Sequence, residues 1–151
     1  MEYMNKTVEI YTDGACSGNP GIGGWGVYLI YGDNRKEISG SEYNTTNNRM
    51  ELKAAIEGLN ALKRPSNIII YTDSVYLKDG ITKWIFNWQK NDWKNSNKKD
   101  VKNKDLWISL IGSAEMHQIE WKWVKGHIGN VGNEIADNLA TNAISDARSI
   151  E

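Results

Sequence analysis

Two apolar stretches of the chain end in the same tripeptide, Tyr-Thr-Asp. Residues 8–13 (VEIYTD) and 68–73 (IIIYTD) are both rich in β-branched side chains, which favour strands. If the two strands pair in parallel, Asp13 and Asp73 lie side by side at the carboxyl edge of one sheet, about 4.8 Å apart. At an effective dielectric of about 20, their repulsion is on the order of 3 kcal/mol. A fold that keeps such a pair needs a compensating charge, and a divalent cation is the usual one.

The chain has 151 residues, enough for one domain with a sizeable core. Its composition, 40% hydrophobic and 25% charged, is typical of a soluble globular protein. It has no apolar run of membrane-spanning length, no signal-peptide pattern at its start, and a single cysteine, Cys16, which cannot form an internal disulfide. These features predict one cytoplasmic domain over residues 1–151, with its core at about 7–145 and no membrane partner.

The apolar spacing predicts the element order βββαβ, then two or more helices, a fifth strand and a last helix. The strands are expected at 7–13, 25–30, 36–43, 68–73 and 119–124, with a glycine-rich turn at 14–24. The strand at 68–73 is apolar at consecutive positions, as expected for a central strand covered on both faces. The helices are expected from N-cap candidates at 45–48 to about Lys63, around 81–88, around 106–111, and over a final segment with Ala136, Leu139, Ala140 and Ala143 facing inward.

Two more acids lie at the margins of apolar helix faces. Glu51 is about 40° from Ala55 on the helical wheel, and Asp137 is about 20° from Ile144. A single acid at such a margin is most simply a solvated boundary residue. Four acids from two strand ends and two helices are instead a candidate cluster, and their oxygen ligands suit Mg²⁺.

Lysine is concentrated in one segment. Residues 83–104 carry seven lysines and two acids, a local charge of +5 in a chain whose net charge is −1. A basic segment on an acidic body favours a polyanion partner, although a solvated helix and loop would have the same composition. Within it, Trp84 and Trp88 share a helical register with Ile81 and Ile85, which predicts that they belong to the core.

Five motifs occur together in an order and spacing that resemble type 1 ribonuclease H. They are Thr12-Asp13-Gly14, residues 44–51 (NTTNNRME), Thr72-Asp73-Ser74, residues 125–127 (KGH) and residues 133–137 (NEIAD). The resemblance covers about Val8 to Ala143 and is to the short, single-domain bacterial form. It implies an α/β ribonuclease H-like fold, in which a five-stranded mixed sheet is flanked by helices on both faces.

The resemblance also implies an activity. Members of this family are endonucleases that hydrolyse the RNA strand of RNA–DNA hybrids, and they use two Mg²⁺ ions, with Mn²⁺ as an alternative. The products would carry 5′-phosphate and 3′-hydroxyl ends. The cellular role implied is the removal of RNA primers and hybrids during DNA replication and repair, by a monomer.

By the same resemblance, Asp13, Glu51, Asp73 and Asp137 stand at the positions of the metal-binding acids. His127 stands at the position of a loop histidine that acts in proton transfer or product release. We interpret Asp13 as the ligand shared by both ions, because it ends the central strand. Asp73 would then serve the side of the attacking water, and Glu51 the side of the leaving oxygen.

Substrate contacts are expected at four places. Glycine-rich backbone near Gly14, Cys16 and Asn19 can approach a 2′-hydroxyl, the group that distinguishes RNA. By resemblance, Asn47 and Asn48 contact the minor groove, and Thr46 and Asn103 grip a DNA-strand phosphate. The basic protrusion at 83–104 would track the DNA strand through Trp84, Lys90, Trp93, Lys94, Lys98 and Lys99, with Trp93 a better sugar contact than Trp84.

Two positions depart from the family pattern. Asn44 stands where relatives often have Arg, which removes a charge-assisted phosphate contact. Val75 stands where some relatives have Gln, which removes a hydrogen bond in the minor groove. The departure at Asn44 predicts a weaker grip on the DNA strand, or one carried by the lysines.

Two other functions remain open from the residues alone. The first is another nuclease of the same fold, such as a junction resolvase or an integrase-like transferase, and the ordered motifs and basic segment argue against it. The second is a hybrid-binding module without catalysis, and the presence of all four acids argues against it.

Overall fold

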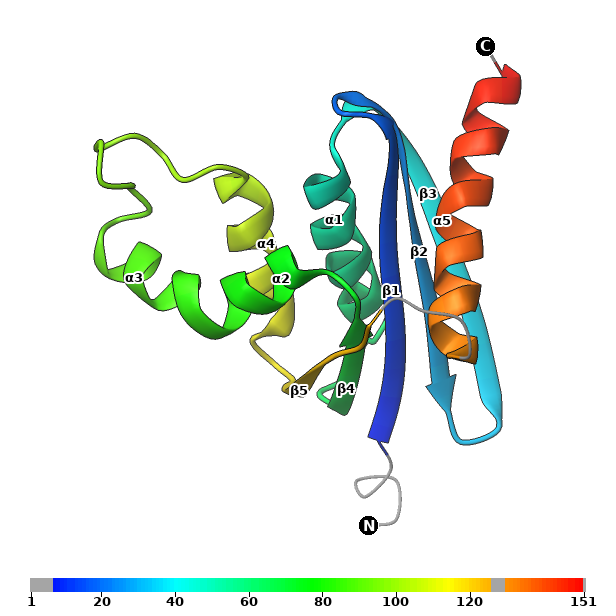
Figure 1. Cartoon of the computed structure of the whole chain (residues 1–151). Coiled ribbons are helices and arrows are strands. Elements are labelled where there is room, and N and C mark those ends of the chain that lie inside the picture. The colour runs from blue at the N-terminus through cyan, green and yellow to red at the C-terminus, as the bar shows by residue number, and fades with distance from the viewer. Residues whose placement is uncertain (1–6, 126–129, 151) are drawn as a thin grey trace.

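The computed structural model describes residues 7–125 and 130–150, which form a mixed sheet between two layers of helices (Figure 1). The five strands lie in the order β3-β2-β1-β4-β5. The strands are β1 (Thr7–Gly18), β2 (Gly21–Tyr31), β3 (Asn34–Thr45), β4 (Asn67–Thr72) and β5 (Gln118–Trp123). The helices are α1 (Asn47–Asn60), α2 (Val75–Asp79), the π-helical turn η2 (Gly80–Trp84), α3 (Ile85–Lys90), α4 (Lys104–Ala114) and α5 (Val131–Ile150). The predicted element order and fold class are confirmed.

The centre of the sheet is the parallel pair β1 and β4. Their register runs from Thr7 opposite Asn67 to Tyr11 opposite Tyr71, so the two Tyr-Thr-Asp stretches are aligned, as predicted. The two tyrosine rings stack with their centroids 4.4 Å apart and their planes 9° from parallel. β5 extends the sheet in parallel beyond β4, whereas β2 and β3 extend it antiparallel beyond β1.

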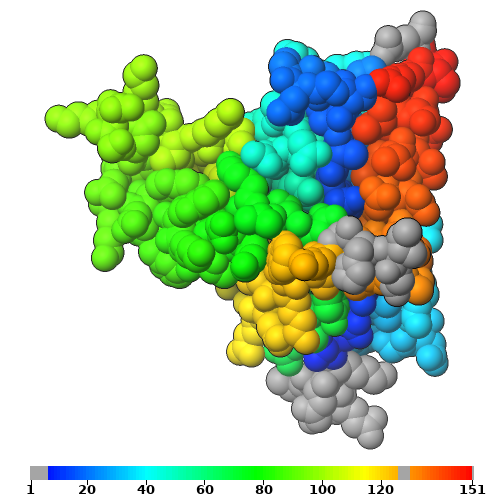
Figure 2. All heavy atoms as spheres, viewed as in Figure 1, coloured from blue at the N-terminus to red at the C-terminus, as the bar shows by residue number. Residues whose placement is uncertain are grey.

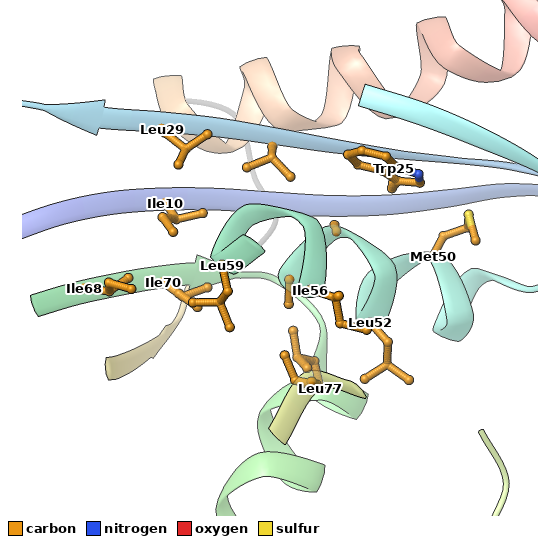
Figure 3. Close-up of a cluster of buried hydrophobic side chains, with 14 of the residues drawn as sticks. Ile10, Trp25, Leu29, Met50, Leu52, Ile56, Leu59, Ile68, Ile70 and Leu77 are labelled. Atoms are coloured by element: carbon orange, nitrogen blue, oxygen red, sulfur yellow. The ribbon is translucent and has the colours of Figure 1, made fainter. Parts of the chain in front are cut away.

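Helices cover the two faces of the sheet unequally. On one face, α1 packs on β1 and β2 and is itself backed by α4, and the main core lies there (Figure 3). On the other face, α5 lies along β1, β2 and β3. The expectation that β4 is covered on both faces is therefore only half right: Ile68 and Ile70 are buried, whereas Ile69 and Tyr71 are only partly buried.

The predicted glycine-rich turn at 14–24 is wrong. β1 continues to Gly18 and β2 begins at Gly21, so the two strands leave only a two-residue turn. The glycines serve close packing instead: a Cβ added at Gly24 would lie 2.2 Å from the carbonyl oxygen of Ala140 in α5, and one added at Gly26, two residues further along β2, would lie 2.3 Å from that of Ala136. A cluster of glycines normally indicates turns, but here it marks strands on which helices lie unusually close.

A helical arm leaves the body after β4. The helices α2, η2 and α3 follow one another from Val75 to Lys90, and the chain then loops out before it returns through α4 (Figure 1). The ring of Trp88 lies 5.8 Å from Trp84, 5.9 Å from Trp93 and 5.4 Å from Trp107, centroid to centroid. Trp88 and Trp93 pack against the core and are partly exposed, whereas Trp84 is partly buried against Tyr76 and Trp88, so the predicted core position is confirmed for Trp88. None of the helices in the described ranges is both long enough and apolar enough to cross a membrane.

Gly26→Ala should destabilise the protein by about 2 kcal/mol, since the added methyl group would overpack the contact between β2 and α5. Gly112→Ala is the matched control, because a Cβ there meets nothing within 4 Å and the residue lies inside α4. That change should stabilise by about 0.5–1 kcal/mol. Urea unfolding measures both, and equal effects of the two substitutions would contradict the close packing of α5.

Candidate active site

Three carboxylates meet at the carboxyl edge of the central strands. One oxygen atom from each of Asp13, Glu51 and Asp73 lies within 4.8 Å of the others. Asp13 and Glu51 are each only 5% exposed, and Asp73 is half-buried just after the end of β4. The adjacency of Asp13 and Asp73 that the repeated tripeptide predicts is therefore present, with Glu51 added from α1.

Local packing explains how Glu51 reaches the strands. Thr46 caps α1 by accepting a hydrogen bond from the backbone N–H of Arg49, which starts the helix one turn before Glu51. A Cβ at Gly14 would lie 2.4 Å from the backbone nitrogen of Glu51. Only glycine lets β1 and the first turns of α1 approach this closely. Gly14 thus brings Glu51 next to Asp13.

Burial and mutual repulsion disfavour negative charge in this cluster. Desolvation, followed by the charge of Asp73 and contact with Asp137, raises the pKa of Asp13 to about 9. Burial, with the charges of Asp13 and Asp73, raises the pKa of Glu51 well above its usual value, and burial raises that of Asp73. Among the described residues, the Oε1 atom of Glu51 is buried without a hydrogen-bond partner. Clustered carboxylate oxygens with an unpartnered, buried acceptor fit a divalent cation.

The other two predicted catalytic residues are Asp137 and His127. Asp137 lies on α5, is exposed, and raises the pKa of Asp13, Glu51 and Asp73 from outside the group of three. His127 lies outside the described residues, so its role stays a prediction.

The predicted 2′-hydroxyl contacts lie where the β1–β2 hairpin meets the start of α1. The thiol of Cys16 donates to the carbonyl of Thr45 at 3.3 Å, and Asn19 Oδ1 accepts from the backbone N–H of Asn47 at 3.1 Å. Asn47 itself is exposed, and Asn48 is partly exposed. Cys16 therefore lies in strand β1, Asn19 lies in the two-residue turn that follows, and both contact the segment that starts α1.

Asn103 lies beside an arginine that is not among the residues predicted from the sequence. Arg49 donates to Asn103 Oδ1 at 3.2 Å and forms a two-pronged salt bridge with Asp105, at 3.0 and 2.8 Å. Asn103 also donates to the hydroxyl of Tyr76 at 3.0 Å. Arg49 lies inside the 44–51 motif, but its partners are more than 50 residues away, and no local pattern indicates them.

The departure at position 44 has a local explanation. Asn44 has a φ of 53°, in the left-handed region, which asparagine tolerates better than most residues with a side chain. Val75 is exposed at the start of α2. Asn44 lacks the charge, and Val75 the polar group, that the family pattern places at these positions.

The basic protrusion, 83–104, stands out from the body (Figure 2). Some of its charge is neutralised: Lys94 and Lys104 pair with Asp100 at 2.6 and 3.5 Å, and Lys83 pairs with Asp79 at 3.6 Å. Within the described part of the chain, four exposed lysines of this segment form no salt bridge: Lys90, Lys98, Lys99 and Lys102. These four are the stronger candidates for a polyanion.

Asp13→Asn should stabilise the metal-free protein at alkaline pH. Folding raises the Asp13 pKa from 3.8 to about 9, so the native state is favoured while this carboxyl is protonated, and that contribution is lost as the pH rises through about 9. With a chelator at pH 9, the variant should melt about 4 °C above the parent. The difference should shrink towards pH 5.

Asp33→Asn, in the exposed turn between β2 and β3, is the control for the loss of one negative charge. Thermal unfolding from pH 5 to 9 measures all three proteins. The same pH dependence in the parent and in Asp13→Asn would contradict the electrostatic account of the cluster.

Proteins of known identity resemble this chain over nearly its whole length. The RNase H family profile matches residues 5–145. A protein named Ribonuclease H from Francisella tularensis subsp. novicida (strain U112) is 61% identical over 148 residues, 97% of each chain. The Ribonuclease H of Dichelobacter nodosus (strain VCS1703A) is 57% identical over 141 residues, 93% of this chain and 94% of that protein.

Solved structures of RNase H proteins also resemble this chain. The crystal structure of LC9-RNase H1, described as a type 1 RNase H with the type 2 active-site motif, aligns with a TM-score of 0.85 at 34% identity and covers 93% of this chain and 73% of that one. The solution structure of the PFV RNase H domain aligns with a TM-score of 0.77 at 27% identity, over 93% of this chain and 96% of that domain. The chain therefore belongs to the ribonuclease H family, and the resemblance to its type 1 members is confirmed.

Proposed function

We propose that this protein is an endonuclease that hydrolyses the RNA strand of RNA–DNA hybrids and leaves 5′-phosphate and 3′-hydroxyl ends. The observation that carries the proposal is the meeting of Asp13, Glu51 and Asp73, whose oxygens lie within 4.8 Å of one another. Such a cluster is costly unless a cation occupies it. In a member of the ribonuclease H family, a cluster of acids that needs a cation is consistent with a metal-dependent site that cleaves phosphodiester bonds.

The cofactor proposed is a pair of Mg²⁺ ions, with Mn²⁺ as an alternative. Bound there, the cations supply Lewis-acid stabilisation of the transferred phosphate and a lower pKa for an attacking water. Asp13 would be the ligand shared by both ions, Asp73 would serve the side of the attacking water, and Glu51 would serve the side of the leaving oxygen. Asp137, exposed beside them on α5, completes the ligand set, and His127 assists proton transfer or product release.

Selection of the hybrid is assigned to polar residues of the hairpin and the start of α1, and to a phosphate contact by Thr46 and Asn103. Gly14, Cys16, Asn19, Asn47 and Asn48 lie on the hairpin and the start of α1, where short polar groups can read a 2′-hydroxyl and the minor groove. Thr46 and Asn103 grip a phosphate of the DNA strand.

The basic protrusion follows the DNA strand through Trp84, Lys90, Trp93, Lys94, Lys98 and Lys99. Removal of RNA primers and other hybrids, by a monomer in the cytoplasm, is the role we assign.

Asp13→Asn or Asp73→Asn should abolish cleavage of a labelled hybrid in Mg²⁺ and leave the fold intact, because each removes a charged oxygen ligand with little change of shape. Circular dichroism checks the fold, and Asp33→Asn is the matched control in an exposed turn. A variant that keeps more than about a tenth of the parent rate would contradict the ligand assignment. Loss of a residue that only supports a metal ligand already lowers activity by about 10–100-fold, and loss of the ligand itself should lower it further.

Changing Lys94, Lys98 and Lys99 to Ala should raise KM for the hybrid and flatten its dependence on salt. On duplex DNA, each neutralised phosphate contributes about 0.9 to the slope of log affinity against log salt. Lys94 is paired with Asp100, so most of the loss should come from Lys98 and Lys99. Lys36→Ala, on β3, is the control. If the slope of the triple variant equals that of the parent, the protrusion does not contact the nucleic acid.

A further inference from the structure

The carbonyl oxygen of Asp73 receives a hydrogen bond from a side chain of another strand. The indole N–H of Trp123, at the end of β5, donates to it at 3.1 Å. This carbonyl lies beyond the end of β4 and before the first helical bond of α2, which runs from Lys78 N–H to the Ser74 carbonyl. Neither the strand ladder nor the helix therefore bonds this carbonyl, and the indole of Trp123 is the group that holds it.

The neighbouring backbone groups are held from several directions. The backbone N–H of Val124 donates to the Thr72 carbonyl at 2.9 Å, which carries the pairing of β4 and β5 one step further. The backbone N–H of Ser74 donates to the Thr72 hydroxyl at 3.1 Å, and the Ser74 hydroxyl caps α2 by accepting from Leu77 N–H at 3.0 Å. The Trp123 bond completes this frame at Asp73 itself.

The indole is held in turn by its own neighbours. The ammonium group of Lys78, on α2, lies 5.3 Å from the centroid of the Trp123 ring, within the range of a cation–π contact. Trp123 is 38% exposed, so its large ring is not kept in place by core burial alone. A partly exposed tryptophan whose N–H points at the backbone of a clustered acid is better explained by that contact than by packing.

We propose that Trp123 is a positioning residue that fixes the backbone of Asp73, so that the Asp73 carboxylate stays aligned with Asp13 and Glu51 for divalent cations. This inference rests on the proposed function of the carboxylates. Fixing the peptide matters because a ligand displaced by about 1 Å loses much of its effect on a reacting centre. Residues that orient metal ligands typically change metal affinity or activity by about 10–100-fold when they are lost.

The test replaces Trp123 with benzothienylalanine, which keeps the bicyclic shape but has sulfur in place of the N–H group. Trp123→Phe is a second variant made from standard residues. The same benzothienylalanine substitution at Trp121 is the matched control, since Trp121 lies two residues earlier on β5 and packs against the core. Mg²⁺ affinity is measured without turnover, from the rise in Tm during a Mg²⁺ titration, and kcat and KM are measured on a labelled hybrid.

The Trp123 variants should need about tenfold more Mg²⁺ for the same rise in Tm, and their kcat should fall by a similar factor. KM for the hybrid should stay within about twofold of the parent, because the substrate-contacting surfaces are untouched. The Trp121 variant should match the parent in all three quantities. A merely structural role would lower Tm in the absence of metal but leave the Mg²⁺ midpoint unchanged, and that result would overturn the proposal.

Asp73→Asn in the same Mg²⁺ titration separates this inference from the function on which it rests. If Asp73→Asn loses the Mg²⁺ response while the Trp123 variants keep the full response of the parent, the carboxylate site stands and the positioning role is refuted. If Asp73→Asn itself responds to Mg²⁺ like the parent, the ligand assignment has failed, and the positioning role falls with it.

Discussion

The structure depends on the parallel pairing of β1 with β4 in one particular register. Tyr11 lies opposite Tyr71, so that Asp13 and Asp73 follow at the same level two residues later. A slip of one residue would turn every side chain of one strand to the opposite face of the sheet. The stacked tyrosines and the buried Ile10, Ile68 and Ile70 disfavour such a slip. Hydrophobic packing thus holds together two charges that repel each other.

The carboxylate cluster opposes folding, although it lies next to a core that favours folding. The core next to it stabilises the fold, whereas the acids themselves have raised pKa values because water has been replaced by protein and by other acids. Without a cation, the cluster reduces stability at neutral and alkaline pH. A divalent cation that binds the folded protein and not the unfolded chain offsets this loss. The stability of the protein therefore rises with the occupancy of the site.

Much of this arrangement can be predicted from the sequence, because it follows from local periodicity. The order of the elements, the alignment of the two Tyr-Thr-Asp stretches and the inward tilt of Glu51 all depend on spacing within single elements. The prediction fails over 14–24. The glycines there indicate a turn, but the segment is mostly extended strand, and the missing side chains let α1 and α5 pack closely against it. The bond from Trp123 to Asp73 spans 50 residues, so local patterns do not indicate it. Arg49 and Asp105 are 56 residues apart, so local patterns do not indicate their salt bridge either.

We propose that the carboxylate cluster cleaves RNA and that the polar and basic surfaces next to it restrict cleavage to RNA paired with DNA. The most direct measurement incubates the protein and Mg²⁺ with an end-labelled RNA–DNA hybrid, and in parallel with duplex DNA, duplex RNA and each single strand. Cleavage of the RNA strand in the hybrid alone, leaving 5′-phosphate ends, is the result we predict. Cleavage of duplex DNA or of single strands at a comparable rate, or an intact hybrid in the presence of Mg²⁺, would contradict it.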